Sequence, residues 1–120
     1  KIDPVVVAEA LSNYKSEDLL ELLLQAANTA NPIVRTRVVV VLGFLEDVRA
    51  IGKLTTLVSD MDEEVRYQSI CALDRISSVD GIPALSQSLR DVSDRNRRRA
   101  VQVLAKFVNS DSLETLGQAL

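Results

Sequence analysis

Residues 31–61 read NPIVRTRVVVVLGFLEDVRAIGKLTTLVSDM, and the same order of apolar residues returns in residues 62–92, DEEVRYQSICALDRISSVDGIPALSQSLRDV. The apolar landmarks form three columns with one constant 31-residue spacing along the whole chain. The columns are Leu11, Leu42, Leu73 and Leu104; Leu20, Ile51, Ile82 and Leu113; and Leu23, Leu54, Leu85 and Leu116. A fixed period of this size is typical of stacked supersecondary units. The sequence therefore predicts four repeats, at about residues 1–30, 31–61, 62–92 and 93–120.

Each repeat is predicted to contain two helices. In the second repeat, Pro32 suits the first turn of a helix because its missing N–H needs no partner there. Apolar residues at helical spacing predict a first helix at about 33–45 and a second at about 49–58. The two stripes are Val34, Val38, Val41, Leu42 and Leu45, and then Ile51, Leu54, Leu57 and Val58. In the third repeat, Leu85 and Leu89 complete the second stripe.

The fold class follows from how such helix pairs bury their apolar faces. One pair is too small to do so alone, and stacked pairs share one continuous core. We therefore expect an all-α chain that forms a single right-handed α-solenoid over residues 1–120. The chain begins at Lys1 without Met and ends at Leu120, a core-type position. We expect a piece of a longer array, with further repeats, a partner or self-association at the ends.

The composition excludes several classes of function. The net charge is −3 and the pI is about 4.9, which gives no general attraction to nucleic acid or anionic membrane. No apolar run is long enough to span a bilayer. The chain has no His and only one Cys, Cys71, so it forms no internal disulfide, no ordinary zinc site and no His-dependent catalytic triad. We expect a cytoplasmic protein with no metal, no cofactor and no enzymatic activity.

A recurring motif carries a family resemblance. Aspartate, valine, arginine and leucine are spaced as in Asp62, Val65, Arg66 and Leu73, and the second repeat has Asn31, Val34, Arg35 and Leu42 at the same spacing. This pattern resembles the short HEAT-like repeats of the phycobilisome lyase-like type. The resemblance implies four 31-residue helix-turn-helix HEAT-like repeats and a protein-binding scaffold. Some members of that superfamily attach or remove bilin chromophores, and some distant relatives bind DNA.

The motif places three arginines, Arg35, Arg66 and Arg97, at equivalent positions. Three evenly stacked guanidinium groups could follow a polyanion. The alternative is structural: each Arg pairs with a loop carboxylate of its own or the next repeat, from Asp60 or Asp62, or from Asp91 or Asp94. The planar guanidinium suits such pairs, and the family resemblance favours this structural interpretation.

A second arginine feature is the basic patch of Arg95, Arg98 and Arg99, which share one helix face at i, i+3 and i+4. This patch could bind an acidic protein, a phosphate or RNA, or it could be a solvated helix face beside Asp91 and Asp94. No aromatic residue is interleaved for base stacking, so nucleic acid is the weaker interpretation.

The outward side of the second helices is the candidate partner-binding groove. Small and uncharged polar residues gather there, and they could accept a helix or an extended segment. The predicted groove residues are Lys53, Thr56, Ala84, Gln87, Thr115 and Gln118. The alternative is a solvated surface without a partner.

These observations predict a non-catalytic scaffold for protein–protein interaction. The first alternative is a bilin lyase-like or phycobilisome-handling subunit, in which Cys71 could contact the bilin; otherwise Cys71 is a small residue at a helix–helix contact. The second alternative is phosphate or nucleic-acid binding through residues 95–99.

Overall fold

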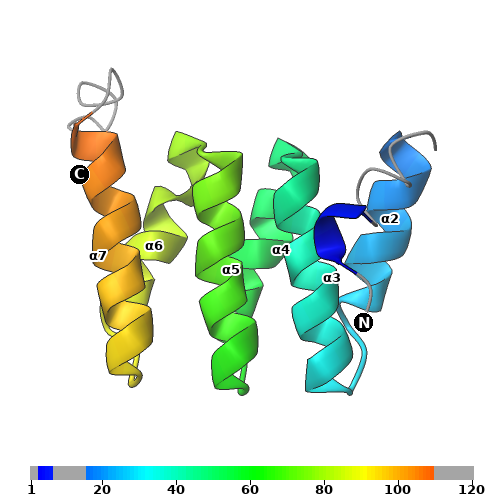
Figure 1. Cartoon of the computed structure of the whole chain (residues 1–120), viewed down its shortest axis with the longest axis horizontal. Helices are drawn as coiled ribbons and strands as arrows, with labels where there is room; N and C mark the ends of the chain where they lie inside the picture. The colour runs from blue at the N-terminus through cyan, green and yellow to red at the C-terminus, as the bar shows by residue number, and fades with distance from the viewer. Residues whose placement is uncertain (1–2, 7–15, 110–120) are drawn as a thin grey trace.

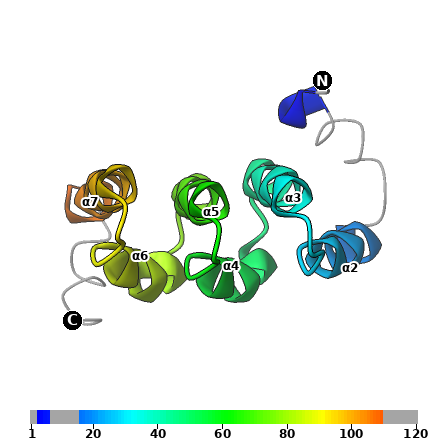
Figure 2. The same ribbon diagram turned by 90° about the horizontal axis from the view of Figure 1, so that it is seen from below.

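Helices α2 to α7 of the computed structural model lie in two layers (Figures 1 and 2). The structure describes residues 3–6 and 16–109. The first layer contains α3 (Pro32–Leu45), α5 (Glu63–Ile76) and α7 (Asp94–Val108), and the second contains α2 (Ser16–Ala26), α4 (Ile51–Leu57) and α6 (Ile82–Ser88). The chain alternates between the layers, and no strand occurs within these described ranges. The all-helical prediction is therefore confirmed.

Side-chain caps explain where the first-layer helices begin. Asn31, Asp62 and Ser93 each have extended backbone angles, and their side chains accept a hydrogen bond from a backbone N–H in the first turn of α3, α5 and α7. Such a cap satisfies a helix N–H that has no partner inside the helix. The three caps occupy equivalent positions of successive repeats, so the sequence period and the period of helix starts coincide.

The first-layer helices α3 and α5 end in the same way. Glu46 and Ser77 adopt left-handed backbone angles, with φ of 54° and 55°, and their N–H groups donate to Gly43 and Leu73. The chain then turns through a short 3₁₀ segment, η1 (Val48–Ala50) or η2 (Val79–Gly81), before the second-layer helix begins. The expected helix at about 49–58 is thus a 3₁₀ turn followed by α4.

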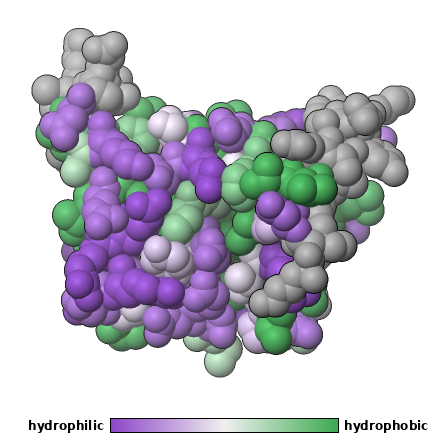
Figure 3. Space-filling model, viewed as in Figure 1, coloured by the Kyte–Doolittle hydropathy of each residue, from purple (hydrophilic) through white to green (hydrophobic). Residues whose placement is uncertain are grey.

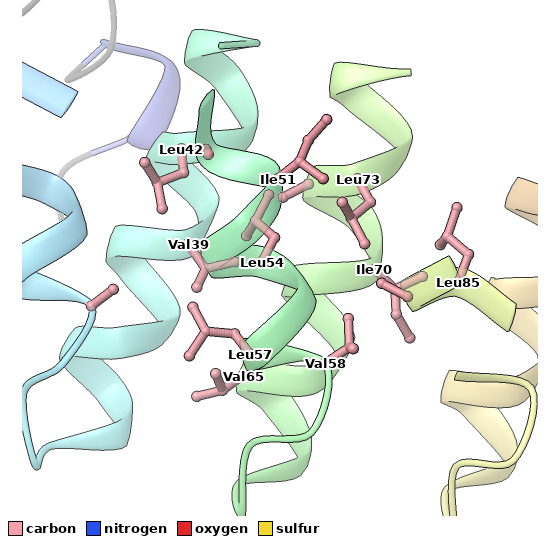
Figure 4. Packing of buried hydrophobic residues seen from close by; sticks show 14 of the residues in the cluster. Val39, Leu42, Ile51, Leu54, Leu57, Val58, Val65, Ile70, Leu73 and Leu85 are labelled. Atoms are coloured by element: carbon pink, nitrogen blue, oxygen red, sulfur yellow. The ribbon is translucent and has the colours of Figure 1, made fainter. Parts of the chain in front are cut away.

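The core lies between the two layers (Figure 4). The second-helix stripe is buried as expected at Ile51, Leu54, Leu57 and Val58. On the first helices the expected stripe is too narrow, because Val39 and Ile70 are fully buried. A first-layer helix is covered by the second layer and by its neighbours in its own layer, so its buried arc is wider than one stripe.

Two residues expected in the stripes are exposed, and Leu45 is half-buried. Val34 and Leu89 each keep 39% of their surface exposed. Val34 lies in the first turn of α3 and Leu89 directly follows α6, so both lie at the edge of the layers rather than between them.

Adjacent first-layer helices approach each other closely at a glycine. A Cβ atom added to Gly43 would lie 2.9 Å from the Cα atom of Ala72 on α5. Gly43 is buried and has ordinary helical backbone angles, so its role is to allow this approach rather than to permit an unusual conformation. The contact fixes the distance between α3 and α5.

The described helices are also too short or too polar to cross a membrane. None of them combines the length and the apolar character that crossing a bilayer requires.

Candidate protein-binding surfaces

The arginine ladder, Arg35, Arg66 and Arg97, lies where the second layer returns to the first. Arg35 donates from Nε and Nη2 to the two carboxylate oxygens of Asp60, both at 3.0 Å. Its Nη1 donates to the carbonyl oxygens of Thr29 and Ala30 at 2.9 Å. One guanidinium therefore joins two successive loops through both side-chain and backbone acceptors.

Arg66 repeats this geometry one period later. Its Nε and Nη2 lie 2.9 and 3.3 Å from the oxygens of Asp91, and its Nη1 donates to the carbonyls of Asp60 and Met61. The side chains of Arg66 and Asp91 are only 13% and 4% exposed. Because the N–H groups of both guanidinium groups already donate inside the protein, Arg35 and Arg66 have no free pair of donors with which to bind a polyanion.

The pKa of Asp91 reflects this environment. Burial acts to raise the pKa of the carboxyl group. Hydrogen bonds from Arg66, from the backbone N–H of Ser93 and from Asn96 outweigh burial and hold the pKa below its ordinary value. The ionised form of Asp91 is therefore the one that the fold stabilises.

Arg97 differs from the other two members of the ladder. Its Nη1 donates to the carbonyl of Asp91 at 2.7 Å, but its carboxylate partner is Asp94 in its own helix, at 3.2 Å. The side chains of this pair are 42% and 65% exposed. Arg97 thus provides a solvent-exposed comparison for the buried pairs.

The basic patch does not form one face of unpaired cations. Arg95 pairs with Glu64 at 2.9 Å and lies 3.8 Å from the centre of the Tyr67 ring, while Arg99 pairs with Asp74 at 3.1 Å. Residues four apart share one face of a helix. Because the partners Glu64 and Asp74 both lie on α5, this face of α7 is the one toward α5.

The remaining member of the patch, Arg98, is 73% exposed and pairs with Asp94 in its own helix. The patch is therefore largely neutralised by carboxylates of α5 and α7. The hydrogen bond between Arg95 and Glu64 is the main cause of both pKa shifts: it lowers the pKa of Glu64 and raises the pKa of Arg95.

Two of the predicted groove residues line a hollow between α2 and α4. A hollow of about 380 Å³ is lined there by Lys53 and Thr56, together with Glu21, Leu24, Gln25, Asn28 and Gly52. The Lys53 ammonium donates to the side-chain oxygen of Asn28 in the turn that follows α2. A Cβ atom on Gly52 would meet nothing within 4 Å, so the glycine leaves the floor of the hollow open.

The other predicted groove residues separate from this hollow. Ala84 was expected on the groove surface and is instead 1% exposed, within the core cluster. Ala84 lies one 31-residue period after Lys53, at the equivalent position of α6. Because α4 and α6 are in contact, a side chain as short as alanine ends inside the packed region, while lysine extends beyond it.

Further along the second layer, Gln87 is exposed and donates to the hydroxyl of Ser59 at 2.5 Å. Thr115 and Gln118 lie outside the described residues. The expected continuous groove is therefore one hollow at α2 and α4, with a separate polar contact at α4 and α6.

Sequence reasoning missed two apolar residues at the tips of loops. Met61 is 98% exposed and Val92 is 89% exposed. They occupy equivalent positions of adjacent repeats, and each follows an aspartate that pairs with the arginine ladder. An apolar residue in an otherwise polar turn, repeated at the period of the chain, is the signal that could have revealed them.

Neither Cys71 nor the acidic residues within the described ranges form a metal site. Cys71 is partly buried on α5 and lines a hollow of about 290 Å³ with Phe44, Asp74 and Arg99 among its neighbours. Among the residues that the structure describes, no group of three His, Cys, Asp or Glu side chains could hold a metal ion.

Comparison with known families matches this architecture. A family model of HEAT repeats matches residues 4–73 and 53–120, so the chain belongs to the HEAT-repeat family. The match supports HEAT-like repeats without singling out the phycobilisome lyase-like type. No curated protein matches the chain. HEAT repeats commonly mediate protein–protein interaction, which is consistent with a scaffold.

Proposed function

We propose that this protein is a non-catalytic scaffold that binds a protein partner on its second layer, at the hollow between α2 and α4. The proposal includes four 31-residue repeats, stacked as a right-handed solenoid over residues 1–120. The observation that carries it is the open hollow itself, about 380 Å³ in volume, whose lining includes the uncharged polar Gln25, Asn28 and Thr56 and only two charged side chains, Glu21 and Lys53. Such a surface accepts a partner side chain without the cost of removing several charges from water.

Charge substitution at the hollow tests the proposal. The wild-type chain is used to isolate a partner from an extract of the source organism, and the affinity of the purified partner is then measured by calorimetry. Lys53→Glu and Thr56→Glu should weaken binding at least about tenfold, or 1.4 kcal/mol. Arg98→Glu is the control, because Arg98 is 73% exposed on the other layer. Unchanged affinity in the hollow variants would remove this surface from the proposal.

Bilin handling stays an alternative that rests on the family resemblance. It predicts a change in visible absorbance when bilin is added to the protein, and a flat difference spectrum would exclude it. Phosphate or nucleic-acid binding through residues 95–99 loses support, since Arg95 and Arg99 are paired with carboxylates of α5. That alternative predicts binding that falls steeply with salt.

A further inference from the structure

A second surface lies at the edge where the second-layer helices connect to the first-layer helices. We call this surface the loop edge and define it as residues 27–31, 58–62 and 89–93. The three segments lie along one side of the molecule in Figure 1 and face the reader in Figure 2. In Figure 3 the faces of α5 and α7 are mainly hydrophilic, whereas apolar colour appears along this lower edge.

The loop edge presents Met61 and Val92 almost entirely to solvent. The other side chains of these two turns are mostly Ser and Asp, which cap helices or accept ladder hydrogen bonds. Exposed apolar residues are ordinary when they are scattered singly. Two of them at equivalent positions of adjacent repeats form a row instead.

The backbone that carries Met61 is held on both sides. Arg66 donates to the carbonyl oxygens of Asp60 and Met61 at 3.0 and 3.2 Å, and the Asp60 carboxylate accepts the N–H of Asp62 at 2.9 Å. Asp60 is itself fixed by Arg35. Met61 therefore extends from a loop whose conformation is set before any partner arrives, which lowers the entropic cost of binding.

Val92 is held in an equivalent way. The carbonyl of Asp91 accepts from Arg97 at 2.7 Å, and the Asp91 carboxylate accepts from Arg66 and from the N–H of Ser93 at 2.8 Å. The arginine ladder thus positions both apolar side chains.

A hollow of about 350 Å³ separates the two loops, with Val58, Ser59 and Val92 among its lining residues. Its charged lining residues are Asp60, Arg66, Arg90 and Asp91. Arg35 balances Asp60 and Arg66 balances Asp91. Arg90 is exposed, and no carboxylate of the described residues pairs with it, so it leaves this hollow with one positive charge to offer.

We propose that the loop edge binds an amphipathic helix of another protein, with apolar side chains over Met61 and Val92 and a carboxylate over Arg90. Neighbouring packed helices lie about 8–10 Å apart, so adjacent loops step by a similar distance. Seven residues of an α-helix advance about 10.5 Å, and residues at i, i+4 and i+7 share a face. Partner residues i and i+7 therefore reach the two loop tips at Met61 and Val92, and partner residue i+4 enters the hollow between them.

Charge decides which end of the partner helix is acidic. Asp62 and Glu63 follow Met61 at the start of α5. Arg90 precedes Val92, and the acidic residue that follows Val92, Asp94, is paired with Arg97 and Arg98. The acidic turn of the partner therefore lies at the Val92 end.

Fluorescence anisotropy with designed peptides tests this proposal. The probe is a labelled helical peptide with Leu at i, i+4 and i+7 and two Glu in the turn beside one terminal Leu. We expect saturable binding, at least about tenfold tighter than for the same peptide with Lys in place of Glu. Met61→Ser with Val92→Ser should weaken binding at least about tenfold, and Arg90→Glu should reverse the preference toward the Lys peptide.

Three outcomes would overturn the proposal: no saturable binding of the Glu peptide, equal binding by the Met61→Ser, Val92→Ser variant, or a wild-type dimer in sedimentation that this variant abolishes. The last outcome would make the occupant a second copy of the chain. Both substituted side chains are almost fully exposed, so thermal unfolding of the variant should match the wild type and show that it folds. Lys53→Glu should leave peptide binding unchanged, which separates this surface from the hollow of the proposed function.

Discussion

Removal of Arg66 is the sharpest test of what holds adjacent repeats together. Arg66→Ala deletes two hydrogen bonds to the Asp91 carboxylate and two to the carbonyl oxygens of Asp60 and Met61. The Asp91 carboxylate, 4% exposed, would then remain buried without its cation.

The size of the effect follows from this burial. Removal of one partner from a buried ion pair costs about 3–5 kcal/mol, because the other charge stays uncompensated. Asp91 keeps hydrogen bonds from the N–H of Ser93 and from Asn96, which places the expected loss at the lower end, about 3 kcal/mol. For a chain of this size, that loss lowers the midpoint of thermal unfolding by about 12 °C.

Arg97→Ala is the matched control. It removes the same side chain at the same position of the next repeat, but the Arg97–Asp94 pair is 42% and 65% exposed. Exposed pairs contribute about 0–1 kcal/mol, so Arg97→Ala should cost about 1 kcal/mol, including the carbonyl hydrogen bond.

The assay is urea unfolding at pH 7 followed by circular dichroism, which reports loss of helix. The reasoning would be refuted by a loss of less than about 1 kcal/mol in Arg66→Ala, or by equal losses in Arg66→Ala and Arg97→Ala. Either result would mean that the buried geometry of the ladder does not determine its contribution to stability.

Three further predictions concern packing, backbone conformation and pH. Gly43→Ala should lower the free energy of unfolding by about 1–3 kcal/mol, because its Cβ would lie 2.9 Å from Ala72. Gly52→Ala, in open space, should raise the free energy of unfolding by about 0.5–1 kcal/mol. Urea unfolding measures both variants, and equal effects would contradict the close approach at Gly43. Ser77→Gly should raise the midpoint of thermal unfolding by a few degrees, since glycine adopts φ of 55° without the cost of about 1 kcal/mol that serine bears, and a lowered midpoint would argue against this conformation. The pKa of Asp91 is lowered from 3.8, so its stabilising contribution is present above about pH 4 and is lost as the pH falls through the lowered pKa of the folded state. The difference in free energy of unfolding between wild type and Asp91→Asn should therefore shrink in unfolding measured from pH 5 to pH 2. A constant difference would contradict the lowered pKa.

Local signals in the sequence predicted the helices well. Pro32 in a first turn and the apolar spacing of each stripe are properties of short segments, and the expected helices follow from them. The observed helix at Pro32–Leu45 agrees closely with the prediction of 33–45. These features could be predicted because a helix is stabilised by contacts between residues that are near in sequence.

The candidate binding surfaces were predicted less well. The groove prediction treated Lys53 and Ala84 as equivalent because they share a register, but the lengths of the two side chains make one reach solvent and the other end in the core. The basic patch was predicted from the spacing of Arg95 and Arg99 on one helix, while both pair across to α5. In each case the outcome depends on a neighbouring helix.

The sequence by itself determined the repeat period, the all-helical class and the family, because each of them is written in local spacing that repeats along the chain. Only the tertiary structure decided which charges are paired and which apolar side chains remain exposed, as at Arg66 and Met61. Those outcomes depend on the separation and rotation of adjacent helices. Packing of the whole core sets that geometry, including the close contact at Gly43, and no single segment contains it.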